Sequence, residues 1–305
     1  MSHVQKTLAI LTHSSDRFRL DGGLLLLLIP KWQAMGIRVD IVTERGPFVE
    51  ADIALLHVDQ SVVPDACRRV ADRYPRVVNG RVLDIRKRTF STLLLEHDMP
   101  ARHADETAPV IVKSDWNYGG LPECRWRARQ SPFWSLVGYF KGDNRVLQYL
   151  LRRDERRSWR RKRVLRDYRV YPHSGLVPEG VWRNRNLIVE RFMAERDGDL
   201  YCCRHWLFFG TREVSVRTFS REPMVKFITG APAVRSAEPL LEPIPDELRA
   251  MRARLGFDYG KFDYAIVNGQ VVLYDVNRTP GASSDPRNHQ RTLAVLPEGL
   301  YDFLS

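Results

Sequence analysis

The alternation of short apolar runs with helical segments in the first 83 residues restricts the fold more than any other feature of the sequence. Strands are expected at residues 8–11, 39–42, 53–57 and 77–78. Helices are expected at residues 24–35 and 64–74. Strands that alternate with helices predict a parallel sheet covered by helices, in which ligands bind beyond the carboxyl ends of the strands. Five polar residues are therefore expected near a binding site: Thr12, His13, Ser14, Asp59 and Asn79.

The rest of the chain mixes hairpins with single helices. Two β-hairpins are expected, one around Gly210-Thr211 and one around Asn268-Gly269, and Asn-Gly is the strongest short-range hairpin signal. Further strands are expected at residues 109–113 and 187–192, and helices at residues 146–168 and 245–255. Another helix, which ends before Pro100, is expected to present four residues on one face: Phe90, Leu93, Leu94 and His97.

Composition excludes some classes of protein. A hydrophobic content of 44% and a charged content of 28% over 305 residues are typical of a folded domain. No apolar run reaches the roughly 20 residues that a membrane helix needs, so we expect no membrane partner and no signal peptide. The four cysteines form no Cys-x-x-Cys pair. A zinc site or a disulfide framework is therefore not expected, and a reducing, cytoplasmic location is.

The hairpin around Asn268-Gly269 carries the most informative group of polar residues. Side chains alternate along a strand, so Asp275 and Asn277 face the same side, and the turn brings Asp263 back beside them. Magnesium prefers oxygen ligands of this kind and typically combines one or two carboxylates with nucleotide phosphates. The alternative is a hairpin whose polar residues are simply solvated on its outer face.

This segment resembles the metal-binding hairpin of the ATP-grasp superfamily, whose usual form is an acid, a short turn, Glu-x-Asn and then Pro-Gly. Here Asp263 is followed by Asp275-Val276-Asn277 and Pro280-Gly281. Asp275 stands where the superfamily more often has Glu, and its shorter reach could alter how a second metal ion is held. The resemblance implies that Asp263, Asp275 and Asn277 bind Mg²⁺.

Further landmarks of the superfamily follow in the expected order. Lys113 ends a strand that resembles the one whose lysine contacts nucleotide phosphates, and residues 115–120 resemble the mobile loop that closes over them. Residues 187–192 resemble the strand that binds adenine through its backbone, with an acid near the ribose. The resemblance implies these ATP-binding residues: Lys87, Lys113, Asn117, Gly119, Gly120, Glu190 and Phe192. Taken alone, each is explained as well by a surface lysine, a simple turn or a surface ion pair.

The resemblance covers nearly all of the chain and implies an α/β protein with the ATP-grasp fold. An N-terminal parallel-sheet domain is expected at residues 1–83, followed by an ATP-grasp domain at residues 84–305 in which two α+β lobes clasp ATP. The resemblance also implies a ligase that activates a carboxylate as an acyl phosphate for attack by an amine or another nucleophile, releasing ADP and phosphate. One alternative is an ATP-grasp kinase for a small molecule, and another is a basic polyanion-binding protein with weak or no ATP turnover. Many relatives are dimers, which makes a homodimer an option here.

Four arginines are candidates for holding the anionic substrate and intermediate: Arg204, Arg217, Arg221 and Arg278. Guanidinium groups bind carboxylate and phosphate through two parallel hydrogen bonds. Arg278 is the first choice because it directly follows Asn277. For the other three, a solvated hairpin face is the simpler explanation.

The segment between Lys113 and Glu190 is longer than in simpler members of the superfamily. We therefore expect a lid lobe at about residues 105–190 that carries an insertion at about residues 124–183. Residues 152–169 contain ten basic and three acidic residues, a net charge of +7 out of +11 for the chain. A small-molecule or polymer carboxylate substrate that is itself anionic could bind there, whereas nucleic acid is not expected. The alternative is a helix packed through Leu147, Leu150 and Leu151, with a solvated arginine face.

Overall fold

The computed structural model describes residues 5–16, 23–94, 107–130, 132, 143–165, 167–223, 235–282 and 286–304. The chain forms two units, and each is built from separate stretches of sequence. Unit 1 consists of Met1–Asp59, Val63–Leu83 and Ala194–Ser305, and unit 2 consists of Gln60–Val62 and Asp84–Met193. The expected division into domains at residues 1–83 and 84–305 stays a prediction. Among the described residues, no helix has the length and apolar character needed to cross a membrane.

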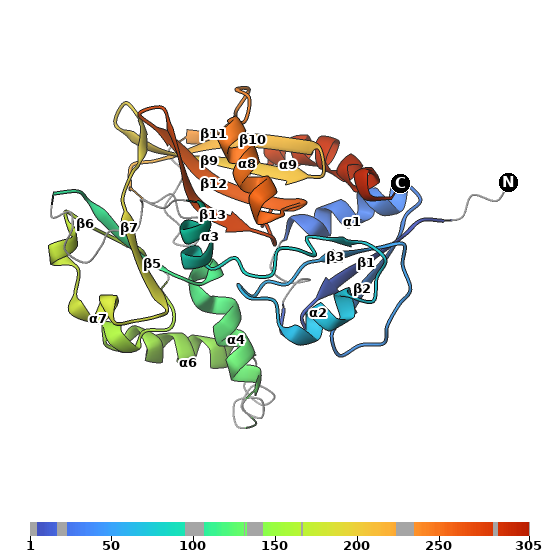
Figure 1. The fold of residues 1–305 in the computed structure, drawn as a ribbon, viewed down its shortest axis with the longest axis horizontal. Coiled ribbons are helices and arrows are strands. Elements are labelled where there is room, and N and C mark those ends of the chain that lie inside the picture. The colour runs from blue at the N-terminus through green and yellow to red at the C-terminus, as the bar shows by residue number, and fades with distance from the viewer. Residues whose placement is uncertain are drawn as a thin grey trace. The chain divides into compact units, whose positions relative to one another are not determined.

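Unit 1 begins with a parallel sheet in the order β2-β1-β3-β4 (Figure 1). Its strands are β1 (Thr7–Thr12), β2 (Arg38–Thr43), β3 (Ile53–Leu56) and β4 (Val77–Val78). Every pair in this sheet is parallel, as the alternation in the sequence predicts. The helices α1 (Leu24–Ala34) and α2 (Asp65–Ala71) connect the strands. The expected parallel α/β arrangement of residues 7–78 is confirmed.

A second, antiparallel sheet completes unit 1 in the order β11-β10-β9-β12-β13, with β8 paired to β9. Its strands are β8 (Glu195–Asp197), β9 (Leu200–Phe209), β10 (Arg212–Ser220), β11 (Arg235–Pro239), β12 (Tyr259–Val267) and β13 (Gln270–Asn277). Both expected hairpins are present. Asn268 and Gly269 have φ angles of 52° and 78°, the positive values that a tight two-residue hairpin turn requires. The helix α8 (Asp246–Leu255) ends at Gly256, and α9 (Pro286–Val295) and the 3₁₀ segment η4 (Leu296–Phe303) follow.

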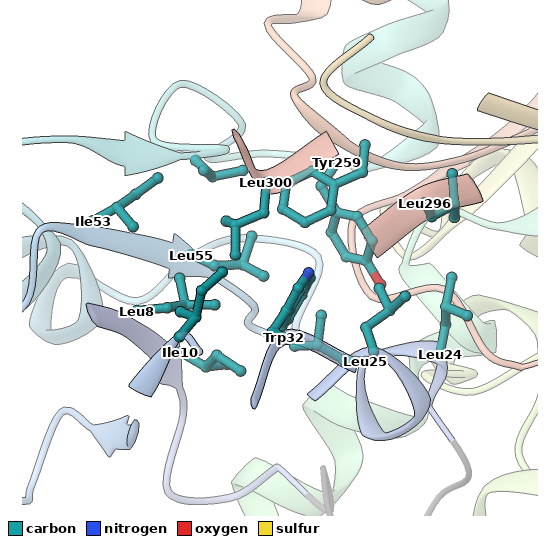
Figure 2. Close-up of a cluster of buried hydrophobic side chains, with 14 of the residues drawn as sticks. Leu8, Ile10, Leu24, Leu25, Trp32, Ile53, Leu55, Tyr259, Leu296 and Leu300 are labelled. Carbon is teal, nitrogen blue, oxygen red and sulfur yellow. The ribbon is translucent and has the colours of Figure 1, made fainter. Parts of the chain in front are cut away.

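One hydrophobic core joins the two sheets of unit 1. Figure 2 shows Trp32 of α1 among apolar side chains from β1, β3, β12 and η4, including Leu8, Leu55 and Leu300. Trp32 is fully buried, and its indole Nε1 donates to the carbonyl oxygen of Pro297 at 3.0 Å. Segments from the two ends of the chain therefore fold as one body.

Unit 2 contains an antiparallel sheet in the order β6-β5-β7. Its strands are β5 (Val110–Ser114), β6 (Arg169–Tyr171) and β7 (Leu187–Arg191). Its helices are α3 (Lys87–Leu94), α4 (Leu121–Gln130), α6 (Asp143–Glu155) and α7 (Glu179–Trp182). The 3₁₀ turns are η1 (Asn117–Gly120), η2 (Trp159–Arg161) and η3 (Ser174–Leu176). The apolar face of the sheet packs on Leu165, Val177 and Val181.

The helix expected at residues 146–168 was predicted too long, because α6 ends at Glu155. The helical spacing of apolar residues stops at Leu151, so a longer helix would have no further face to bury. The carboxylate of Asp154 also accepts the backbone N–H groups of Arg163 and Val164, which turns the chain back on itself. The side chains of Leu93, Leu94 and His97, named in the sequence predictions, lie outside the described residues.

Candidate functional site

The predicted metal-binding residues share one face of the β12–β13 hairpin. Asp263 lies directly opposite Asp275, and Lys261 lies opposite Asn277. Because side chains two residues apart on a strand point the same way, all four are expected on one face. The structure thus brings Asp263, Asp275 and Asn277 to one face, as expected, and adds Lys261, which sequence reasoning missed.

Asp263 has two cationic or potentially cationic neighbours. The Nζ of Lys261 is 3.0 Å from its Oδ1, and the Nδ1 of His205 in β9 is 2.6 Å from the same oxygen. On its other side, the Nε2 of His205 is 2.8 Å from the Oγ1 of Thr218 in β10. Burial alone would raise the pKa of Asp263, but Lys261 and His205 outweigh it and hold that pKa below its usual range. Asp263 is therefore an anion at neutral pH.

The chemistry of these donors fits a magnesium ion that arrives with a nucleotide. Two carboxylates and one amide are oxygen ligands of the kind that Mg²⁺ takes alongside phosphates. No three His, Cys, Asp or Glu side chains in the described stretches are arranged to hold a metal ion, and an ion at this face would take its ligands from the two carboxylates, the amide and the phosphates. The Oδ1 of Asn277 accepts the backbone N–H of Thr279 at 2.8 Å, which fixes the amide at the end of β13.

Thr279 connects this hairpin to the carboxyl ends of the parallel strands. Its Oγ1 is 3.1 Å from Oδ1 of Asp59, which follows β3. Oδ2 of Asp16, after β1, accepts the backbone N–H groups of His13 and Asp59 at 3.0 and 3.2 Å. Burial first, and then the charge of Asp59, raise the pKa of Asp16 to about 7. A polar cluster thus lies where the parallel sheet predicts a ligand, within the same unit as the hairpin face.

Two other predicted members of that cluster fare differently. Ser14 is linked to it through Glu44, whose Oε2 accepts the backbone N–H of Ser14 at 2.8 Å and whose Oε1 lies 3.5 Å from Nε2 of His13. Asn79 does not contact it, because its amide is hydrogen-bonded to the backbone of Asp258 and Tyr259. Asn79 joins the first sheet to β12.

Arg204 and Arg217 are cross-strand partners in β9 and β10 and share Glu195. The guanidinium of Arg204 makes three hydrogen bonds to Glu195 at 2.8–3.0 Å and one to Glu242 at 2.7 Å. Burial would lower the pKa of Arg204, but these two carboxylates raise it above its usual value. Arg217 is a quarter exposed and lies 3.6–3.9 Å from three acids, Asp197, Glu238 and Glu195, which are looser pairs than those of Arg204. Of the two, Arg217 is the more accessible to a substrate.

Arg278 is fully buried. Its Nε and Nη1 donate to the backbone oxygens of Val58 and Val82 at 2.9 and 2.7 Å, just beyond β3 and β4. Arg221 is exposed after the end of β10. Arg204 and Arg278 thus have clear structural partners, and the substrate roles of all four arginines stay predictions.

In unit 2, the predicted phosphate and ribose residues come together on β5 and β7. The Nζ of Lys113 is 2.6 Å from Oε2 of Glu190, and both side chains are buried. Ser91 of α3 donates to Oε1 of Glu190 at 3.0 Å. Lys87 is buried one turn earlier in the same helix, on the face that carries Ser91. An anionic ligand could exchange with Glu190 for the Lys113 ammonium.

The predicted glycine loop is a tight turn packed within unit 2. The backbone N–H of Asn117 donates to Oγ of Ser61 at 2.7 Å, and the carbonyl of Gly119 accepts the N–H of Leu165 at 3.0 Å. Gly120 has a φ angle of +85°, and a Cβ there would come within 2.8 Å of the carbonyl oxygen of Arg163. Only glycine fits this position.

Phe192 follows β7 and is half-buried. Its backbone N–H donates to the carbonyl of Pro109 at 2.8 Å. The strand expected to bind adenine thus makes one further backbone hydrogen bond, one residue beyond the end of β7.

Comparison with known proteins finds no match by sequence but finds similar solved structures. No family model and no curated protein matches this sequence. The structure is similar to D-alanine–D-alanine ligase from Bacillus anthracis, with a TM-score of 0.50 and 11% identity, over 98% of this chain and 96% of that one. It is also similar to the ATP-grasp ligase PsnB, solved with precursor peptide PsnA2 and AMPPNP, with a TM-score of 0.51 and 11% identity, over 97% of this chain and 96% of that one. The chain has the ATP-grasp fold.

The ATP-grasp fold predicted from the order of four motifs is therefore confirmed over nearly the whole chain. At this identity, the similarity is one of fold alone, and the roles of individual residues are a separate question. Lys261 was within reach of sequence reasoning, because it lies two residues before Asp263 in an expected strand. His205 was not, because it belongs to a different hairpin and carries no local signal of its neighbour.

Proposed function

We propose that this chain is an ATP-dependent ligase that activates a carboxylate for attack by an amine or another nucleophile. The observation that carries the proposal is the β12–β13 register, which sets Asp263 opposite Asp275 with Asn277 two residues further on the same face. In a chain with the ATP-grasp fold, this oxygen-rich face is the natural place for the metal ion of a nucleotide. The proposed metal-binding residues all lie in unit 1, and the proposed phosphate- and ribose-binding residues all lie in unit 2.

Asp263, Asp275 and Asn277 would hold Mg²⁺, which when bound offsets the negative charge of the nucleotide phosphates. Lys261, whose Nζ is 3.0 Å from Oδ1 of Asp263, is a candidate for stabilising the negative charge that develops on the transferred phosphoryl group. His205 contacts Asp263 and Thr218 at once, and it would keep the Asp263 carboxylate in one orientation.

Lys113 and Lys87 are proposed to contact phosphate oxygens, and Glu190 the ribose. The buried Lys113–Glu190 pair supports this assignment. The Lys113 ammonium is already desolvated and positioned by Glu190, so less is lost when it binds a phosphate oxygen. We also propose that Asn117, Gly119 and Gly120 line the phosphates and that the backbone around Phe192 binds the base.

The proposed reaction has two balanced steps. A carboxylate oxygen of the substrate attacks the γ-phosphorus of ATP, and the bond from that phosphorus to the bridging oxygen breaks, which gives an acyl phosphate and ADP. An amine then attacks the acyl carbon, phosphate leaves, and the amine loses a proton. The His13, Asp16 and Asp59 cluster, joined to β13 through Thr279, is proposed to contact the substrates, and Arg217 the carboxylate.

Nucleotide binding and product analysis test this function. We would titrate the full chain with AMPPNP in the presence of Mg²⁺, and then follow ATP consumption with a pool of cell metabolites. The proposal predicts nucleotide binding and the release of ADP with phosphate. Release of AMP with pyrophosphate would contradict it, as would turnover that survives in the Asp263→Ala protein.

A further inference from the structure

A line of three arginines and one tyrosine runs along α6 in unit 2. Arg145, Tyr149, Arg152 and Arg156 follow one another at intervals of four, three and four residues, and all four are exposed. At 3.6 residues per turn, these intervals place Arg145, Tyr149 and Arg152 within about 60° of one another around the helix axis, and Arg156 lies in the turn that directly follows α6. We call these four residues the α6 basic stripe. It is about 16 Å long at 1.5 Å per residue.

The three arginines of the stripe have no acidic partner anywhere in the described parts of the chain. Two acids lie in the same stretch of chain: Asp154 is buried and turned towards Arg157 and the backbone of Arg163, whereas Glu155 is exposed and forms no ion pair with Arg152 or Arg156. Like charges spaced four apart repel, which costs a helix a few tenths of a kcal/mol per pair. The helix dipole at the end of α6 favours Arg152, but it does not act on Arg145 two turns earlier. These three exposed arginines are therefore available to an anionic partner.

The stripe stands on a fixed platform. The opposite face of α6 packs through Leu151 against Leu121 of α4 and Val164. Asp154 holds the returning chain, and Nζ of Lys162 donates to the carbonyl of Glu155 at 2.9 Å. Figure 1 shows α6 and α4 crossing within this unit. Arginines on a rigid helix lose less freedom when they bind than arginines on a loop would.

We propose that the α6 basic stripe binds an extended, acidic segment of a polypeptide substrate. In an extended chain, alternate side chains point the same way about every 7 Å, so a segment of about five residues spans the stripe and presents three carboxylates to it. Arginine forks pair with carboxylates through two hydrogen bonds. This inference rests on the proposed function, because the polypeptide would bring the carboxylate that is activated.

A nucleic acid fits the stripe less well. Even single nucleic-acid-binding modules bury about 600–1,000 Å² of protein surface, which needs several neighbouring elements. The stripe is one side chain wide and lies on α6 and the turn after it, while the other exposed arginines of this segment, such as Arg153, Arg160 and Arg161, lie off the stripe. An extended acidic peptide, in contrast, needs only a single line of cationic side chains to bind.

The test is fluorescence anisotropy on the full chain without nucleotide. The probe is a fluorescein-labelled peptide of eight residues that alternates Glu with Ser, and its control alternates Gln with Ser. The test variant is Arg152→Gln with Arg156→Gln. The matched control is Arg68→Gln with Arg69→Gln, which removes two exposed arginines from α2 and changes the net charge equally. Arg152→Lys with Arg156→Lys keeps the charge, and circular dichroism checks that each variant is folded.

We expect the Glu peptide to bind, to weaken steeply as salt rises, and to lose about tenfold in affinity in the Arg152/Arg156 variant. The α2 control should stay within twofold of the parent protein. Equal loss in both glutamine variants, or equal binding of the two peptides, overturns the inference. A single-stranded DNA of 20 nucleotides that binds more tightly than the Glu peptide, and is lost in the same variant, also overturns it. The assay contains no ATP, so its outcome is independent of whether the proposed function fails.

Discussion

Replacing Asn79 with Ala should destabilise unit 1 strongly, because this fully buried amide joins the parallel sheet to β12. Its Nδ2 donates to the carbonyl of Tyr259 at 2.8 Å, and its Oδ1 accepts the N–H groups of Asp258 and Tyr259, both at 3.0 Å. The alanine leaves three backbone groups without these partners, at about 1 kcal/mol or more each. Asn79 also has a φ angle of +60°, where alanine costs about 1 kcal/mol. The expected loss is about 4 kcal/mol.

Asn268→Ala is the matched control for this prediction. Asn268 has a φ angle of +52° in an exposed turn, so the same substitution there should cost only the backbone term of about 1 kcal/mol. Urea unfolding followed by circular dichroism measures both losses. For a unit of this size, 4 kcal/mol also corresponds to a fall in melting temperature of about 10 °C. If the two variants lose the same free energy of unfolding, the hydrogen bonds of Asn79 do not hold the sheets together as argued.

Three further predictions concern the proposed site. Lys113→Ala should weaken AMPPNP binding at least tenfold by titration calorimetry, and unchanged affinity would remove this lysine from the site. Asp263→Ala should abolish ATP turnover while the circular dichroism spectrum stays that of a folded protein; near-normal turnover would refute the metal assignment. The pKa of Asp16 is raised by burial and by Asp59 to about 7, so the folded state binds the proton more tightly than the unfolded state. Protonation of Asp16 therefore stabilises the fold fully below about pH 4, and this stabilisation is lost as the pH rises to 7. Asp16→Asn should flatten the dependence of the free energy of unfolding on pH between about 4 and 7, measured by urea unfolding. A slope that persists in the variant would show that another group is responsible.

The elements that could be predicted from the sequence are those specified by local pattern. The strands of the first sheet are short apolar runs between helices, and the β12–β13 hairpin has an Asn-Gly turn that adopts positive φ angles readily. Their predicted limits agree with the structure to within a few residues. The shared face of Asp263, Asp275 and Asn277 follows from alternation alone.

What could not be predicted depends on contacts between distant residues. The end of α6 is set by Asp154 bonding to residues nine and ten positions ahead, which no periodicity reveals. The carboxylates that bind Arg204 belong to Glu195 in β8 and to Glu242. Both are distant from Arg204 in the sequence, so its ion pairs could not be predicted from local pattern. His205 meets Asp263 only because β9 pairs with β12. Secondary-structure propensity is a property of short segments, whereas these contacts form only when distant strands pair in the folded protein.

Trapping of an acyl phosphate tests the central claim most directly. The full chain would be incubated with Mg-ATP, hydroxylamine and a cell extract that supplies small carboxylates and peptides, and the products would be identified by mass spectrometry. The proposed function predicts a hydroxamate formed in step with ADP and absent from the Asp263→Ala protein, and its mass would identify the acid. ADP formed together with a phosphorylated metabolite, and without any hydroxamate, would contradict the claim and identify the chain as a kinase.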